Sequence, residues 1–169
     1  MPWTDATGWI ASSSPAAAWV ASTPVAAAMR GHAWLYPIVE TAHILGFAVL
    51  VGAVAMFDLR VLGFGRELPV RALARHLLPW SVGSLLLVVP TGLLMFSTQP
   101  IEMLGNPVFL LKLCLIAAAG VNALLFHLGP YRGAAGWQDD IPGWARLQAA
   151  LSLLLWMAVI TCGRMLAYV

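Results

Sequence analysis

The chain has 169 residues, of which 61% are hydrophobic and only 9% are charged, and its mean hydropathy is +0.85. Soluble domains have about 45–50% apolar and about 25% charged residues. The few charged residues of this chain therefore cannot cover a water-exposed surface. The formal net charge of +2 comes from scattered basic residues without dense basic runs, which excludes a nucleic-acid-binding surface. The composition therefore predicts an integral protein of a lipid bilayer.

Residues 1–33 are predicted to form an interfacial segment on the outer, periplasmic side of the membrane. This segment lacks the basic start of a secretory signal and is too interrupted to span a bilayer. Ser-Pro and Thr-Pro pairs at 14–15 and 23–24 have the pattern of an N-cap followed by proline, which predicts short helices over about 15–21 and 24–30. Tryptophan favours the membrane interface, and four tryptophans accompany the segment: Trp3, Trp9, Trp19 and Trp34.

Four apolar stretches follow, each long enough for the roughly 20-residue helix that crosses a bilayer. They cover about 34–57, 77–96, 107–128 and 147–167. The connections between them are too short to form domains. The predicted fold is therefore all-α, a four-transmembrane-helix bundle over residues 34–169 preceded by the interfacial helices.

The arginines indicate how the bundle is oriented. Lys and Arg are in excess in cytoplasmic loops. The second connection has none, whereas the first and third have six: Arg60, Arg66, Arg71, Arg75, Arg132 and Arg146. We therefore expect both chain termini to be periplasmic.

Ionisable and polar side chains within the spans identify candidate site residues, because such groups are costly in lipid and usually face the bundle interior. Helical spacing places Glu40, His43 and Asp58 on one face of the first span. Depth along the spans separates an outer cluster from an inner one. The outer cluster has Glu40, His43, Lys112 and Arg164, and the inner one has Asp58, Arg60, His76, Asn122 and His127.

The outer cluster has one carboxylate against two cations, which leaves room for an anion such as a carboxylate-bearing cofactor. The alternative is an internal ion pair, Glu40 with Lys112 or Arg164, that only sets helix register. His43 and His127 are candidate haem or metal ligands, since helical bundles build cofactor sites from facing side chains. His76, beside Arg75, is better explained as a solvated residue.

Sulfur-containing side chains offer a different ligand set. Cys114 and Cys162, with Met95 or Met165, would suit Cu(I). The alternative is that they only pack against apolar neighbours. No nucleophilic constellation and no phosphate-binding glycine loop can be recognised, so no catalytic residue is predicted.

The chain resembles a family of small bacterial inner-membrane proteins of unknown function. The motifs that carry this resemblance are STPVAAAMR at 22–30, WLYP at 34–37, ETAH at 40–43, DLR at 58–60, LLPW at 77–80, TGLLMF at 91–96, Lys112, NALLFH at 122–127 and GR at 163–164. More distantly, it is similar to CopD-type copper-resistance proteins and HemJ-type haem-binding protoporphyrinogen oxidases. That similarity implies that His43 is a haem or copper ligand and that Lys112 is a partner of the bound group.

These observations lead to three functional hypotheses for a multi-pass protein of the bacterial inner membrane. The first is a protein of electron transfer or porphyrin redox chemistry that binds haem b, with a redox partner in the membrane. In it, His43 and His127 ligate iron, Lys112 and Arg164 offset the propionate charges, and Glu40 and Asn122 line the site. The second is a non-enzymatic subunit or scaffold of a larger membrane complex. The third is a membrane protein that handles copper or another small ion. All three hypotheses are compatible with a homo-oligomer.

Overall fold

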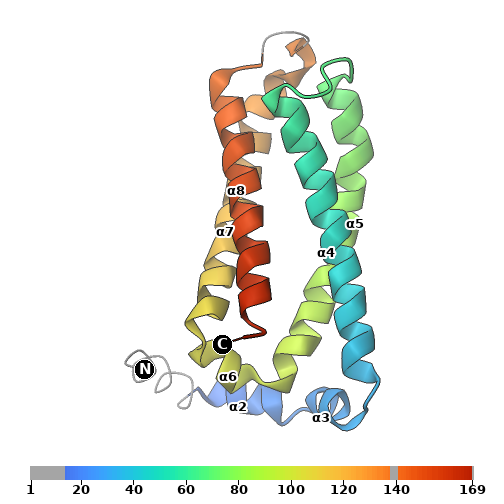
Figure 1. The fold of residues 1–169 in the computed structure, drawn as a ribbon, viewed down its shortest axis with the longest axis vertical. Coiled ribbons are helices and arrows are strands. Elements are labelled where there is room, and N and C mark those ends of the chain that lie inside the picture. The colour runs from blue at the N-terminus through green and yellow to red at the C-terminus, as the bar shows by residue number, and fades with distance from the viewer. Residues whose placement is uncertain (1–13, 138–140, 169) are drawn as a thin grey trace.

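A computed structural model describes residues 14–137 and 141–168, which are helical and contain no strand. Four of the helices are long and apolar enough to cross a membrane: α4 (Leu35–Leu62), α5 (Val70–Thr98), α7 (Pro107–Leu128) and α8 (Gly143–Met165). They form an antiparallel bundle in which α4 and α7 run one way and α5 and α8 run the other (Figure 1). The predicted all-α fold with four candidate membrane spans is confirmed.

The four long helices pack unevenly around the bundle. The most extensive contact is between α4 and α5, followed by α7 with α8 and α4 with α8. Gly46 permits the close approach of α4 to α5, because a Cβ atom there would lie only 3.0 Å from Val88 Cγ2. The backbones of α5 and α7 make no contact of comparable extent, so the helices of the bundle are least tightly packed between these two.

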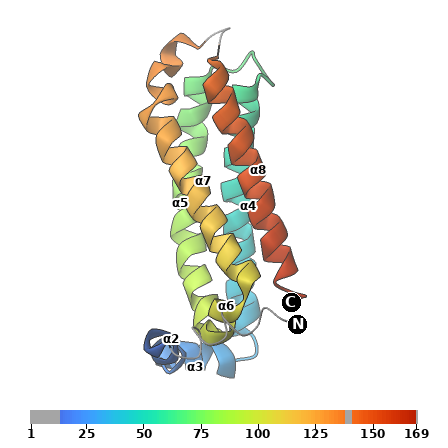
Figure 2. The same cartoon turned by 90° about the vertical axis from the view of Figure 1, so that its left-hand side faces the viewer.

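Short helices cover one end of the bundle (Figure 2). They are α2 (Pro15–Ala21), α3 (Pro24–Gly31) and α6 (Pro100–Gly105). The Ser14 and Thr23 side chains cap α2 and α3 by accepting from backbone N–H groups, so the predicted short helices are confirmed. Arg30 joins this layer to the bundle, since it donates to the carbonyl groups of Ala21 and Thr98 at 2.8 and 3.3 Å.

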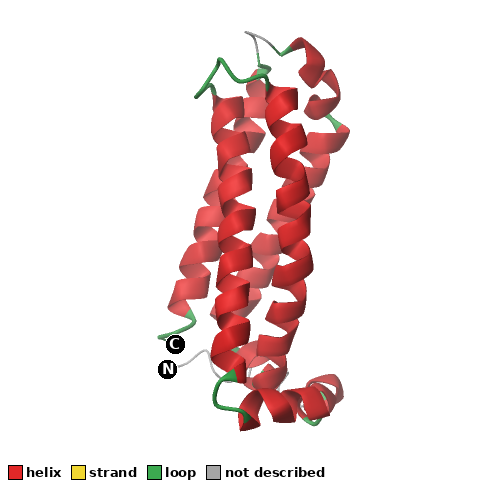
Figure 3. Ribbon diagram, turned by 90° about the vertical axis from the view of Figure 1, so that its right-hand side faces the viewer, coloured by secondary structure: helices red, strands yellow, loops and turns green. Residues whose placement is uncertain are grey.

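The opposite end of the bundle holds the main cluster of buried apolar side chains. The 3₁₀ helix η1 (Pro130–Gly136) lies at this end and packs against α7 and α5 (Figure 3). Arg60, only 3% exposed, donates to the carbonyl groups of Leu68 and Arg66 at 2.6 and 3.0 Å and so holds this loop. The buried cluster consists of Val61, Val70, Phe126, Ala134, Trp137, Ile141, Ala145 and Ala149.

The helices extend further at this end than the apolar stretches predict. The first continues to Leu62 instead of about 57, the second begins at Val70 instead of about 77, and the fourth begins at Gly143 instead of about 147. Charged residues that end an apolar run do not end a helix when they are buried and hydrogen-bonded, as Arg60 is. The helices α6 and η1 were not predicted.

The first part of the predicted interfacial segment, residues 1–13 with Trp3 and Trp9, lies outside the described residues. The helix α2 and the C-terminal end of α8 lie at the same end of the bundle (Figure 1), as an even number of spans requires. Which membrane the protein occupies, and the periplasmic location of this end, stay predictions.

Candidate functional site

His43 is the centre of the outer polar cluster, and α4 holds its ring against α5. The His43 Nδ1 atom lies 3.1 Å from the Val88 carbonyl oxygen and 3.0 Å from Thr91 Oγ1. The Thr91 hydroxyl donates to the Leu87 carbonyl at 2.6 Å, so its oxygen is available as an acceptor. A carbonyl only accepts, so the proton belongs on Nδ1 and the lone pair on Nε2. Within the part of the chain that the structure describes, Nε2 has no hydrogen-bond partner.

Gly92 lets the imidazole pack directly on the backbone of α5. A Cβ atom at this position would lie 3.2 Å from His43 Cε1 and 3.6 Å from Nδ1. Any larger residue would therefore have to displace the ring. Thr91 and Gly92 were not predicted as site residues. The sequence feature that could have identified them is a polar residue followed by a glycine directly after Pro90, within an apolar span.

The charges of Glu40 on α4 and Lys112 on α7 both act on His43. The Lys112 ammonium packs against α8, where a Cβ atom on Gly163 would lie 3.7 Å from Nζ. Buried Cys162 is the neighbouring residue on α8. Over the described ranges, Glu40 forms no ion pair with Lys112 or Arg164, so the alternative of an internal ion pair has no support.

Arg164 does not join this cluster. Its guanidinium donates a hydrogen bond to the Tyr168 hydroxyl and lies 4.8 Å from the centre of the Tyr168 ring. Both contacts connect residues four apart at the exposed end of α8. Arg164 is therefore directed toward Tyr168, and the grouping of Glu40, His43 and Lys112 in one site stays a prediction.

The inner cluster surrounds Asp58 and Asn122. Asn122 is buried and donates from Nδ2 to the Gln148 carbonyl at 3.0 Å, which joins α7 to α8. Asp58 is only 6% exposed and lines the same cavity as Ser152 of α8. Asp58 Oδ2 and Gln148 Oε1 are buried without a hydrogen-bond partner among the described residues.

A cavity of about 290 Å³ lies beside this inner cluster, between all four long helices. Most of its wall is apolar, with aromatic side chains from three helices: Phe57, Phe126 and Trp156. The polar side chains that line it include Asp58, Asn122, His127 and Gln148. A mainly apolar cavity with a few converging polar groups has the character of a ligand site.

The two candidate histidine ligands lie far apart. His127 Nδ1 is 2.8 Å from the Ala123 carbonyl oxygen of its own helix, and the ring lies 5.1 Å from that of Tyr131. Its neighbour Phe126 packs on Phe57, fourteen residues after His43 on α4. At 1.5 Å per residue this separation is about 21 Å, so one iron cannot bind both histidines. His76 is exposed on α5.

The sulfur-containing side chains form no obvious metal centre. Cys114 is exposed and Cys162 is buried, and both are free thiols. Met95 is half-buried and Met165 is exposed. Over residues 14–137 and 141–168, no group of three or more His, Cys, Asp or Glu residues could hold a metal ion. The copper hypothesis stays a prediction with no ligand cluster to support it.

Comparison with known proteins assigns the chain to a family. It belongs to DUF6644, a family of unknown function whose profile matches residues 26–169. No curated protein and no solved structure matches the chain. The similarity to CopD-type and HemJ-type proteins therefore stays a prediction.

Proposed function

We propose that this protein binds b-type haem through His43 and acts in membrane electron transfer or porphyrin redox chemistry. The carrying observation is the hydrogen bond from His43 Nδ1 to the Val88 carbonyl. Histidines that ligate metals commonly donate their other ring N–H to such a carbonyl, which sets the tautomer and the ring orientation. The Nε2 lone pair would then be available to ligate the haem iron.

The charges around His43 suit the carboxylates of haem. Lys112 has no ion pair over the described ranges, so its ammonium is available to a propionate. Buried cations in a membrane protein are costly unless an anion compensates them. Glu40 would orient the imidazole or Lys112 through its charge. The bound haem supplies one-electron chemistry, while the protein supplies position and electrostatics.

The proposal makes His43 the single histidine ligand. His127 lies about 21 Å further along the bundle axis, too far for the same iron. Arg164, bound to Tyr168, is left out of the site. The proposal therefore differs from the sequence hypothesis in the roles of these two residues.

Absorption spectroscopy tests the proposal. The protein is expressed with a haem precursor, purified in detergent, and measured before and after addition of dithionite. We expect a Soret band and a reduced α band that His43→Ala abolishes, that imidazole added to His43→Ala restores, and that His127→Ala leaves intact. A colourless wild-type protein, or bands unchanged in His43→Ala, would overturn the proposal.

A matched pair of variants tests the role of the cation. Lys112→Met and Arg164→Met remove one positive charge each from neighbouring helices. We expect Lys112→Met to lower haem occupancy and Arg164→Met to leave it unchanged, because the charge of Lys112 acts on His43 whereas the Arg164 guanidinium lies over the Tyr168 ring. Equal losses in the two variants would contradict the assignment of Lys112.

A further inference from the structure

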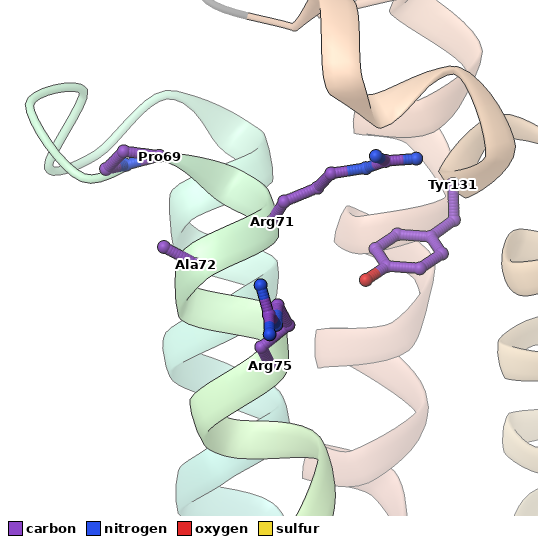
Figure 4. Close-up of a pocket in the computed structure, with 5 residues that line it drawn as sticks. All are labelled: Pro69, Arg71, Ala72, Arg75 and Tyr131. Atoms are coloured by element: carbon purple, nitrogen blue, oxygen red, sulfur yellow. The ribbon is translucent and has the colours of Figure 1, made fainter.

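Two hollows follow each other along α5 at the arginine-bearing end of the bundle, far from His43. The first, of about 450 Å³, is lined by Pro69, Arg71, Ala72, Arg75 and Tyr131 (Figure 4). The second is the largely apolar 290 Å³ cavity, whose α5 wall begins at Ala74 and continues through Leu77 and Leu78. Arg75 and Leu78 are one helical turn apart, so a basic hollow leads directly to an apolar one.

Among the residues that the structure describes, the basic hollow has positive charges without a matching carboxylate. Arg71 and Arg75 are exposed and four residues apart on α5. Like charges at this spacing repel each other. Across residues 14–137 and 141–168, neither guanidinium has an ion pair or a hydrogen bond. An anion bound between them would relieve the repulsion.

Tyr131 completes the hollow from the opposite wall. Figure 4 shows Arg71 reaching from α5 toward the segment that carries Tyr131, while the Tyr131 hydroxyl points back toward α5. The ring is positioned by His127 at 5.1 Å and by Phe126 at 6.3 Å between centroids. The hollow thus combines two guanidinium groups with a hydroxyl donor, which is suitable chemistry for phosphate oxygens.

The apolar cavity lies where the bundle is loosest. It has walls from both α5 and α7, the pair of helices whose backbones make little contact. Lipid-facing positions on these walls are exposed, among them Leu78, Val82 and Leu85. An acyl chain could enter from the bilayer between the two helices without displacing a packed interface.

We infer that this side of the protein binds an anionic phospholipid. Its phosphate lies between Arg71 and Arg75 with the Tyr131 hydroxyl, and one acyl chain lies in the cavity between α5 and α7. Basic pockets between membrane helices recognise anionic lipid headgroups in this way, and the predicted orientation places this end in the cytoplasmic leaflet. The inference does not depend on haem binding.

Native mass spectrometry of the full chain in detergent tests the headgroup. The probes are phosphatidylglycerol and phosphatidylcholine with identical acyl chains, and inorganic phosphate. We expect wild type to retain phosphatidylglycerol at least ten times better than phosphatidylcholine, and Arg71→Gln/Arg75→Gln to lose that preference. The control Arg66→Gln/Arg132→Gln removes the same charge from exposed positions at the same end and should keep it. Equal loss in both double variants would overturn the site.

A second variant tests the acyl chain. Gly120 lines the cavity, and a Cβ atom there meets nothing within 4 Å, so Gly120→Leu fills space without a clash at Cβ. We expect it to weaken phosphatidylglycerol binding several-fold with all the arginines present. Unchanged lipid binding in Gly120→Leu would refute binding of the acyl chain in the cavity. Displacement of the lipid by inorganic phosphate at equal concentration would likewise refute a phospholipid held by both its headgroup and its acyl chain.

Discussion

Substitution of Gly92 by alanine separates the orientation of His43 from the stability of the fold. The added Cβ atom would lie 3.2 Å from His43 Cε1, closer than an ordinary van der Waals contact, so the ring must move by a few tenths of an ångström. That movement disturbs the 3.1 Å contact from Nδ1 to the Val88 carbonyl. Loss of an orienting hydrogen bond of this kind typically lowers metal affinity by about 10–100-fold.

The stability effect of the same substitution should be small. Losing one hydrogen bond costs about 1 kcal/mol, while replacing glycine by alanine within a helix contributes about 1 kcal/mol in the other direction. Gly92→Ala should therefore unfold near the wild-type temperature but bind haem about 10–100 times more weakly. Haem titration followed by absorbance measures the affinity, and thermal unfolding in detergent measures the stability.

Gly83→Ala is the matched control on the same helix. A Cβ atom at Gly83 meets nothing within 4 Å, so this variant gains helix propensity without touching the imidazole. We expect unchanged haem affinity and up to about 1 kcal/mol of added stability. The reasoning is refuted if Gly92→Ala binds haem as tightly as wild type, or if Gly83→Ala weakens binding equally.

Further predictions concern packing and buried hydrogen bonds, all measured by thermal unfolding in detergent. Gly46→Ala should destabilise the protein by about 1–3 kcal/mol, because its added Cβ would lie 3.0 Å from Val88 Cγ2. Gly52→Ala is the control and should not destabilise it, since a Cβ atom there meets nothing within 4 Å. Equal stability of the two variants would contradict the close approach of α4 to α5. Arg60→Met should cost about 1–3 kcal/mol and speed amide exchange in the loop after α4, whose carbonyl groups lose their donors. Asn122→Leu should cost about 1 kcal/mol by removing the hydrogen bond that joins α7 to α8, and wild-type stability would exclude that role.

The bundle follows from the sequence because a bilayer leaves the backbone few choices. Every N–H and C=O group in lipid must be satisfied internally, so each apolar run of sufficient length has to be helical. The short helices α2 and α3 were equally predictable, since Ser14 and Thr23 cap them locally. The extra turn at the end of α4 was not, because it depends on tertiary contacts such as those of Arg60.

The rotation of each helix is harder to predict, and it decides which polar residues share a site. Depth along the spans placed Arg164 with His43, but its guanidinium binds Tyr168, a local partner one turn away. This local contact could have been predicted from the sequence, because a cation and an aromatic residue stand at positions i and i+4. The carbonyl of Val88 as the partner of His43 was not readable, because backbone acceptors carry no sequence signature.

The separation of the two polar clusters makes the two proposals independent of each other. About 21 Å lies between the level of His43 and that of the inner cluster. Substitutions that far apart with no shared partner are additive in most proteins. Arg71→Gln/Arg75→Gln should therefore leave the haem spectrum unchanged, and His43→Ala should leave the phospholipid preference unchanged. Strong coupling between these variants would mean instead that one ligand reaches both clusters through the interior of the bundle.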